Sequence, residues 1–231
     1  MSIIPYPHLE KPAKRPPLDQ TQIVRAGLAL LDEVGLDKLT MRRLAERLGV
    51  KAASLYRHVR NKNELLVLLG DEISGDIPIV SPSGTWRKQL TAMAWNVRRG
   101  LLAHRDGARL LAATPPVGPR RLRHIEAVLR TLRSAGLSRR DAARAAYHCN
   151  NFVTEFVADE ARFAAFAAAP GSSRRKMFAQ ARAQFKSLPR EEYPTVVELA
   201  DYLTEDDPDR LFQFGLELLL RGLKALSRPG T

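Results

Sequence analysis

The stretch LTMRRLAERLGVKAASLYRHVRNK, residues 39–62, contains two short apolar stripes separated by a glycine. Thr40 is a favourable N-cap, because its hydroxyl can accept hydrogen bonds from the free N–H groups of a first helical turn. Gly49 stands where a helix would end in a left-handed residue, and Val50 can fill the turn that follows. The stripe between these signals has helical spacing and comprises Met41, Leu44, Ala45 and Leu48.

A second short helix is expected from residue 52 to about residue 59. Leu55 and Val59 would be buried, and the intervening side chains would point largely outward. Two helices joined by an apolar–Gly–apolar turn are the pattern of a helix-turn-helix, which lays its second helix in the major groove of DNA. The small side chains of Ala52 and Ala53 would let that helix approach the groove closely.

Charge in the same stretch favours a nucleic-acid partner. The only acid is Glu46, against seven basic residues: Arg42, Arg43, Arg47, Lys51, Arg57, Arg60 and Lys62. A solvated basic hairpin with no such partner is the alternative that charge and spacing alone leave open.

The segments IVRAGLALLDEVGLDKLT (23–40) and LYRHVRNKNELL (55–66), with the stretch between them, resemble the DNA-binding domain of TetR-family transcriptional regulators. The resemblance implies that Thr40 caps the first helix of the motif, that Arg42 reaches a base edge or phosphate, and that Arg57 reads a base. It further implies that Ala52, Ala53 and Ser54 face the groove, and that phosphates are bound by Tyr56, His58 and Lys62. Lys51 departs from the Ser or Thr cap of many relatives, so we expect it to contact the DNA backbone.

Composition sets wider limits. The chain has 231 residues, 37 basic and 25 acidic, with a formal charge of +12, which favours a polyanionic partner. The single cysteine, Cys149, excludes an intramolecular disulfide. No charged-then-apolar leader opens the chain and no apolar run approaches the roughly 18–20 residues that span a bilayer. These features predict a cytoplasmic protein without a membrane partner.

The predicted organisation is all-α, in four parts. Residues 1–17 are rich in proline and basic residues and form an extended arm, which is either a disordered tail or a minor-groove contact. Residues 18–66 form the helix-turn-helix domain, beginning with a helix over about 19–34 capped by Asp19 and Gln22. Residues 67–84 are a linking helix and a connector broken by prolines. Residues 85–228 form a ligand-binding and dimerisation domain.

Helices in that last part are expected over about 86–102, 106–113, 120–135, 138–169, 195–203 and 208–226. The polar, basic segment 170–194 is expected to be partly mobile.

The last helix, residues 208–226, is apolar around more than half its circumference and so needs partners on two sides. We expect a second copy of the chain on one side; complete burial within one subunit is the alternative. The expected dimer interface comprises Phe212, Gly215, Leu216, Leu219, Gly222 and Leu223. The segments FQFGLELLLRGLKAL (212–226) and HRDGARLLAATPP (104–116) are similar to the tetracycline-repressor branch of the family, in which the final helices form a dimeric bundle. A two-fold dimer would require a near-palindromic operator, because its reading helices lie about 34–36 Å apart.

The resemblance also implies a small-molecule effector bound between the helices that begin near residues 86, 106, 120 and 138. Tetracycline repressors use histidines where this chain has Leu111 and Pro78, and an asparagine where it has Met93. Because leucine cannot coordinate a hard cation, we expect a moderately large apolar or aromatic effector and no metal–tetracycline chelate. The expected liners are Met93, Trp95, Val97, Leu111, Thr114, Ile125, Val128, Tyr147, Asn151, Phe152 and Phe156.

Two other classes of protein are compared with these features: an enzyme and an architectural DNA-binding protein. An enzyme is disfavoured because the chain lacks HExxH, CxxC, GxSxG and glycine-rich phosphate-loop motifs, and no cofactor or metal is predicted. Adjacent His148 and Cys149 would point about 100° apart on a helix. An architectural DNA-binding protein without an effector remains the alternative, supported by an arginine-rich group at residues 120–140.

Overall fold

The computed structural model describes residues 17–167, 171 and 173–227, and within these ranges the regular elements are helices, with no strand. The all-α prediction is therefore confirmed. The predicted arm lies outside the described residues except for Pro17. In chain order the helices are α1 (Gln20–Val34), α2 (Met41–Leu48), α3 (Ala52–Leu55), α4 (Lys62–Asp76), α5 (Trp86–Leu102), α6 (Gly107–Ala112), α7 (Pro119–Ser134), α8 (Arg139–Ala167), α9 (Arg174–Lys186), α10 (Pro194–Glu198), α11 (Ala200–Leu203) and α12 (Pro208–Leu226).

The first two helices begin at side-chain caps. Asp19 accepts a hydrogen bond from the backbone N–H of Gln22 at 2.7 Å, and the Gln22 side chain accepts one from the Asp19 N–H at 3.2 Å. This reciprocal pair satisfies two N–H groups that a helix start leaves free. The Thr40 hydroxyl caps α2 by accepting from Arg43 N–H at 3.2 Å. Gly49 ends α2 in the left-handed conformation, φ 66° and ψ 34°, as the sequence indicates.

Helix α3 is shorter than the predicted span of residues 52 to 59. Only Ala52–Leu55 is α-helical, and the chain then forms a turn in which the His58 and Val59 N–H groups both donate to Leu55 O at 2.9 Å. The cause lies in the next element: Asn61 caps α4 with an extended backbone, φ −163° and ψ 177°, so the chain must leave the helical conformation before it. Leu55 and Val59 are nevertheless buried, as expected.

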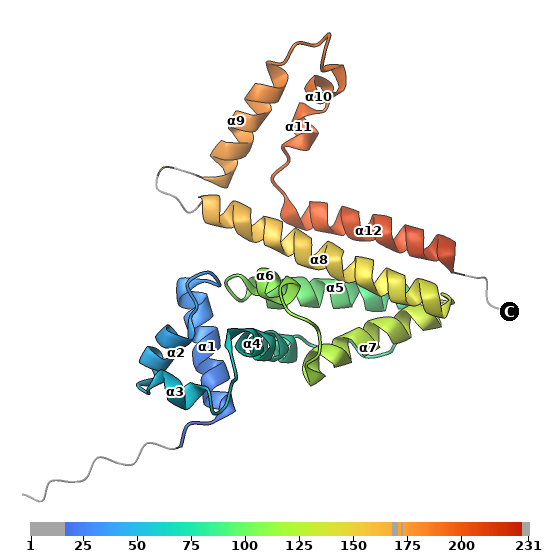
Figure 1. The fold of residues 1–231 in the computed structure, drawn as a ribbon. Helices are drawn as coiled ribbons and strands as arrows, with labels where there is room; N and C mark the ends of the chain where they lie inside the picture. The colour runs from blue at the N-terminus through green and yellow to red at the C-terminus, as the bar shows by residue number, and fades with distance from the viewer. Residues whose placement is uncertain (1–16, 168–170, 172, 228–231) are drawn as a thin grey trace, which may run out of the picture.

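Helix α4 joins the two parts of the molecule. It packs against α1 on one side and against α5, α6 and α7 on the other (Figure 1). Its buried residues include Leu65, Leu69 and Ile73, which belong to one continuous apolar core. The helix therefore crosses the boundary at residue 66 that the sequence suggests.

The larger part is a helical bundle. Helices α8 and α12 run side by side, with α5 beneath them and α6 and α7 packed against α8 (Figure 1). Phe212, fully buried on α12, is packed against Trp95, Phe152 and Phe156, with ring centroids 4.9 to 5.3 Å apart. This aromatic cluster locks α12 onto α5 and α8.

Helices α9, α10 and α11 form a helical extension that projects from the bundle between the ends of α8 and α12 (Figure 1). The interpretation of residues 170–194 as a polar, partly mobile segment missed α9. Ser173 caps this helix by accepting from Lys176 N–H at 3.1 Å, and Lys186 pairs with Asp201 of α11 at 2.8 Å. The Phe178 ring also packs against Phe163 of α8, with centroids 5.8 Å apart. None of the residues of α9 is buried, so the helix leaves no continuous apolar stripe in the sequence.

Candidate nucleic-acid interface and effector cavity

The candidate nucleic-acid interface lies on α2, α3 and the turn after α3. Leu55 and Val59 anchor the reading segment in the core, and Lys51, Ala53, Tyr56 and Arg57 are exposed beside them. The Tyr56 side chain, at 51% exposed, is unusually open for an aromatic residue. Ala52, Ser54, His58 and Lys62 are half-buried, and Thr40 is occupied as the α2 cap. The anchoring of α3 therefore turns a row of polar and small side chains outward.

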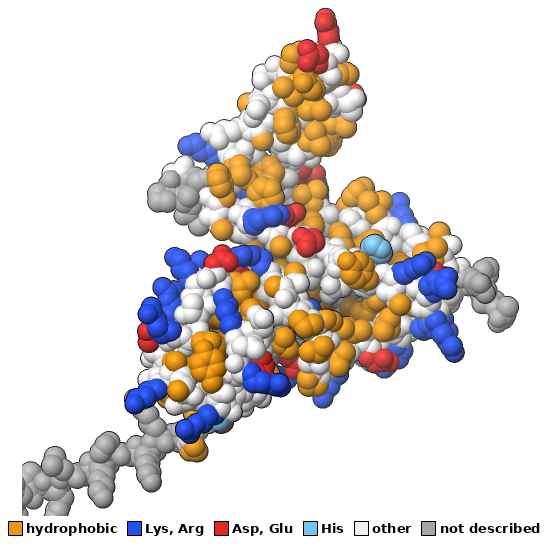
Figure 2. Space-filling view, in the orientation of Figure 1, with side chains coloured by type: hydrophobic (Ala, Val, Ile, Leu, Met, Phe, Trp, Pro, Cys, Tyr) orange, Lys and Arg blue, Asp and Glu red, His pale blue; other side chains and the backbone are white. Residues whose placement is uncertain are grey.

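Ion pairs divide the basic residues of this surface. Arg42 pairs with Glu46 at 3.5 Å and Arg60 with Glu64 at 3.5 Å. Within the described residues Lys51 and Arg57 have no acidic partner, so their charges are available to phosphates or bases. Figure 2 shows Lys and Arg side chains gathered over this lobe of the molecule.

The larger part contains a cavity of about 720 Å³ between α4, α5, α6, α7, α8 and α12. A drug-sized ligand occupies a pocket of about 300–1,000 Å³. Nine of the eleven predicted liners surround it: Met93, Val97, Leu111, Thr114, Ile125, Val128, Tyr147, Asn151 and Phe152.

Trp95 and Phe156 lie outside the lining. The Trp95 indole N–H donates to the Gln213 side chain at 3.1 Å, and both rings pack on Phe212. The helical period turns these two side chains into the aromatic cluster and away from the cavity in which they are expected from the sequence. The lining also includes α12 residues that were not predicted as liners: Leu216, Leu219 and Leu220.

Two basic residues of α7, Arg121 and His124, also line the cavity, and no sequence pattern in the arginine-rich group indicates that they point inward. The Arg121 guanidinium donates to Leu111 O at 2.7 Å and to the Thr114 carbonyl and hydroxyl at 3.0 and 2.9 Å. It therefore caps the end of α6. Burial lowers the pKa of Arg121, and the nearby Asp71 charge raises it. His124 Nε2 donates to Ser74 O in the last turn of α4 at 2.8 Å.

A buried acid on α4 caps α7. Gly118 precedes the helix and offers no side chain, and Asp71 Oδ1 instead accepts from the Arg121 N–H at 2.9 Å. A Cβ on Gly118 would lie 2.1 Å from that oxygen, so the close approach needs glycine. Arg120 pairs with Glu72 at the same junction. Helix α4 is thus fastened to the cavity wall.

The loop before α6 contacts the helix-turn-helix directly. Asp106 Oδ2 accepts from the Leu36 N–H at 2.8 Å, and Arg109 pairs with Asp37 at 3.0 Å. Hydrogen bonding to Arg109 lowers the pKa of the Asp37 carboxyl. Asp106 is a non-glycine residue with positive φ, 58°, a conformation that costs energy and that aspartate tolerates better than most residues. Helices α4 and α6 therefore each connect the cavity to the lobe that carries α3.

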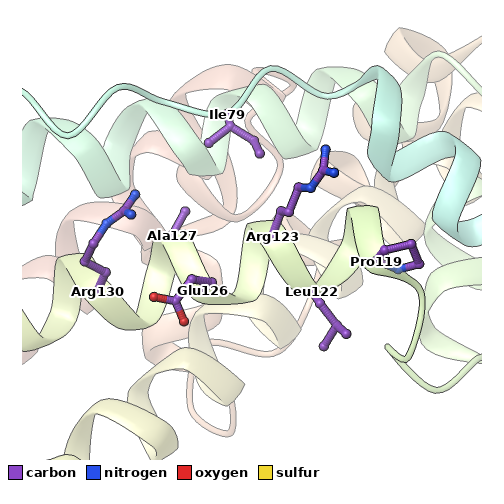
Figure 3. A pocket seen from close by; sticks show the side chains of 7 residues that line it. All are labelled: Ile79, Pro119, Leu122, Arg123, Glu126, Ala127 and Arg130. Atoms are coloured by element: carbon purple, nitrogen blue, oxygen red, sulfur yellow. The ribbon is translucent and has the colours of Figure 1, made fainter.

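A second, shallower hollow of about 550 Å³ lies between the connector and α7. Figure 3 shows Ile79 above, and Arg123, Ala127 and Arg130 along the facing side of α7. Ile79 and Leu122 are about half exposed, so this is a surface depression separate from the larger cavity.

The predicted dimer residues separate into two sets. Phe212, Leu216 and Leu223 are buried inside this chain, Leu219 lines the cavity, and Gly215 is pressed against Phe152. Only Gly222 has open space beside it. The outward apolar face of α12 is instead formed by Leu211, Phe214, Leu218 and Leu226. For most of the predicted residues the alternative, burial within one subunit, describes their position.

Within the described residues, no cluster of three or more His, Cys, Asp or Glu is arranged to hold a metal ion. No helix in those ranges combines the length and apolarity needed to cross a membrane.

The comparisons with known proteins agree with this geometry. Residues 78–227 match the family model described as tetracyclin repressor-like, C-terminal domain, and residues 23–69 match the model of bacterial regulatory proteins, tetR family. The chain belongs to the TetR family of transcriptional regulators. Accordingly it is a DNA-binding regulator and not an enzyme.

Several TetR-family relatives match over most of the chain. The tetracycline repressor protein class A from transposon 1721 of Escherichia coli is 35% identical, over 89% of this chain and 90% of that protein. The repressor DrrR1 of Streptomyces coeruleorubidus is 31% identical, over 92% and 79%. The structure of ActR from Streptomyces coelicolor in complex with actinorhodin superposes with a TM-score of 0.83, at 38% identity, over 91% of this chain and 97% of that one.

Proposed function

We propose that this chain is a homodimeric repressor that releases a near-palindromic operator when a small, largely apolar or aromatic molecule enters the cavity. The observation that carries the proposal is the double connection described above. Helices α4 and α6 both line the cavity and both contact the lobe that presents α3. A molecule that moves either helix changes the position of the reading segment.

Helix α4 is the longer of these two connections between the cavity and the lobe that presents α3. It begins beside the reading segment at Lys62, and Ser74, in its last turn, lines the cavity. Its 15 residues span about 22 Å at 1.5 Å per residue. A small displacement at Ser74 or at the Asp71 cap is transmitted rigidly to the lobe, because a continuous helix does not bend easily between its ends.

The proposed dimer uses the outward face of α12 and the neighbouring exposed surface of α8, including Tyr147. A row of Leu211, Phe214, Leu218 and Leu226 is too apolar to be a typical solvent face. Two-fold pairing there would present two reading segments to successive half-sites about 34–36 Å apart. Loss of one half-site would then cost far more than half of the affinity.

For the reading residues we keep the proposed roles. Arg57 reads a base, Tyr56, His58 and Lys62 contact phosphates, and Lys51 contacts the DNA backbone. Arg42 reaches a base edge or a phosphate after breaking its exposed ion pair with Glu46. An exposed ion pair of this kind contributes about 1 kcal/mol or less to stability. Ala52, Ala53 and Ser54 allow the close approach.

A metal–tetracycline chelate is not the proposed effector. Leu111 and Met93 both face the cavity, and neither offers an oxygen or nitrogen ligand. Pro78 is exposed and outside the lining. This separates the proposed effector from those of the tetracycline repressors, even though 35% of the aligned residues are shared with the class A protein.

The architectural alternative loses part of its support from the arginine-rich group. Arg120 pairs with Glu72, Arg121 caps α6, and Arg133 donates to Leu137 O, so these three side chains make contacts within the chain, whereas Arg123, Arg130, Arg139 and Arg140 are exposed. We therefore favour a regulator that acts in the cytoplasm, where its DNA lies.

The test uses a labelled duplex whose sequence is taken from the DNA upstream of the chain's own gene. Fluorescence anisotropy measures the release of this duplex from the protein by each member of a panel of aromatic compounds that includes magnesium–tetracycline. At least one apolar aromatic compound should release the wild-type protein, and magnesium–tetracycline should not. Val128→Trp, which places an indole ring in the cavity, should strongly weaken release. Release of Val128→Trp by the same compound at the same concentration would contradict a cavity effector.

A further inference from the structure

The two basic side chains in the cavity wall, Arg121 and His124, indicate a chemical feature of the effector in addition to its apolar character. Arg121 keeps its charge, because a guanidinium stays protonated in proteins. Among the described residues no carboxylate is within ion-pair distance of its guanidinium. Arg98, which is more deeply buried than the half-buried Arg121, has two such partners, Glu160 at 3.0 Å and Asp209 at 2.7 Å. The buried Asp71 lies near enough to raise the pKa of Arg121, but it accepts from the Arg121 backbone N–H and makes no ion pair with the guanidinium. A partly desolvated cation without a directly paired anion is costly, so the guanidinium can still gain from an anion that reaches it.

Arg121 still has donors to offer. Nη1 bonds to the two Thr114 oxygens and Nη2 to Leu111 O. Within the described residues Nε and the second hydrogen of Nη2 have no acceptor, and the residue lines the cavity. Two parallel N–H groups on one edge of a guanidinium match the two oxygens of a carboxylate.

His124 lies one helical turn further along α7, on the same face, and also lines the cavity. The one carboxylate in the lining is Glu155 of α8, which is exposed to solvent, where water and salt weaken its repulsion of an anion. The remaining lining is predominantly aliphatic and aromatic. The cavity thus combines a large apolar wall with one positive end.

We infer that the effector is an apolar ring system carrying an acidic group, and that Arg121 binds that group with His124 beside it. The inference rests on the proposed effector cavity and adds the chemical class of its occupant. It also explains how occupancy reaches DNA. An anion at the free N–H groups of Arg121 lies beside the carbonyls at the end of α6 that the same guanidinium binds, and beside the Asp71 and Ser74 contacts of α4, so one group acts on both connections to the helix-turn-helix.

The test compares two fluorescent probes with the same aromatic skeleton, one acidic and one neutral. 1-Anilinonaphthalene-8-sulfonate carries a sulfonate, and N-phenyl-1-naphthylamine lacks it. Titration of the full-length protein should give a lower Kd for the sulfonate. In Arg121→Gln the ratio of the two Kd values should shift by about tenfold toward the neutral probe, the usual loss for one charged hydrogen-bonded pair.

Two further variants separate local recognition from general charge and folding. Arg121→Lys retains the positive charge and should retain most of the preference for the sulfonate. Arg123→Gln removes a charge from the outer face of the same helix, in the surface hollow of Figure 3, and should leave the ratio as in wild type. Because each ratio is internal to one variant, a partly unfolded fraction lowers both signals and does not shift it.

The outcomes distinguish failure of the acidic-group inference from failure of the proposed effector cavity. If both probes bind, Val128→Trp excludes both, and Arg121→Gln leaves their ratio unchanged, the cavity stands and the acidic class is wrong. An equal shift in Arg123→Gln would likewise overturn the role of Arg121. If neither probe binds the wild-type protein, or Val128→Trp binds both normally, the effector cavity itself fails and the inference with it.

Discussion

Two basic side chains at the DNA-facing surface, Arg57 and Lys62, differ in position. Arg57 is exposed in the turn after α3, whereas Lys62 is the first residue of α4 and half-buried. Arg57→Ala should relax base preference at one position of each half-site. Lys62→Ala should weaken binding to all sequences alike and lower the salt slope by about one. Anisotropy on operator variants across a salt series measures both, and identical losses on every sequence from both variants would contradict the assigned roles.

The thiol of Cys149 provides a test of the cavity wall at the level of one atom. Burial raises the pKa of Cys149 to about 11. Because the thiolate is the reactive form, alkylation by iodoacetamide at pH 7 should be about two orders of magnitude slower than for a free cysteine with pKa near 8.5. The rate should rise with pH toward 11 and reach the free value in denaturant. Alkylation of the native protein at the free rate would show that α8 does not enclose the thiol.

Sequence reasoning worked for residues whose role is local. The Thr40 cap and the Gly49 terminus depend on side chains within a few positions of each other, and the structure has both. Arg121 is the opposite case. Its position in the cavity depends on how α7 packs against α4 and α6, and a run of arginines carries no sign of which one turns inward.

At the scale of elements, the Asp106 turn tests the contact between α6 and the helix-turn-helix. Asp106→Ala removes the acceptor of the part-buried Leu36 N–H and places alanine at positive φ, which should lower the free energy of unfolding by about 1–3 kcal/mol. Asp106→Asn keeps an acceptor oxygen and a residue that tolerates this conformation.

Urea denaturation followed by circular dichroism gives both values. The loss in Asp106→Asn should be less than half of that in Asp106→Ala, because asparagine removes only the charge that faces Arg109. Equal losses in the two variants would assign the effect to the Arg109 ion pair and not to the Leu36 bond.

Apolar periodicity predicted the helices that bury a stripe and missed the one that does not. Helices α1, α5 and α7 follow their patterns to within a few residues. Helix α9 is held by Ser173 at its start, by an ion pair to α11 and by Phe178 against Phe163 of α8, but it buries none of its residues, so its sequence shows no apolar stripe. Helix α3 ends early because Asn61 requires an extended residue, a demand made by the following element.

At the scale of the molecule, the assembly depends on which face of α12 meets a second copy. The helix is apolar around more than half its circumference, and periodicity cannot assign its two apolar faces. The chain itself covers Phe212 and Leu216, while Phe214 is 66% exposed and Leu218 54% exposed. Only the packing of α12 on α5 and α8 distinguishes these two sets of residues.

Phe214→Glu should therefore convert the protein to monomer at micromolar concentration, because a charge placed in an apolar interface is left without a partner. Sedimentation velocity measures the change, and DNA affinity should fall by about 100-fold or more with the loss of avidity. Leu122→Glu, on the exposed side of α7, is the matched control and should remain dimeric. A Phe214→Glu protein that sediments as the wild type would place the interface elsewhere.

The most direct test of the whole account is selection of binding sites from a pool of random 30-base-pair duplexes by the full-length protein. A dimer with two reading segments predicts an enriched inverted repeat whose half-site centres lie about 10 base pairs or a multiple apart. The enriched duplex should bind at least about 1,000-fold more tightly than a scrambled duplex at physiological salt. A pool that never converges, with binding that depends on salt and not on sequence, would contradict the account and favour an architectural protein.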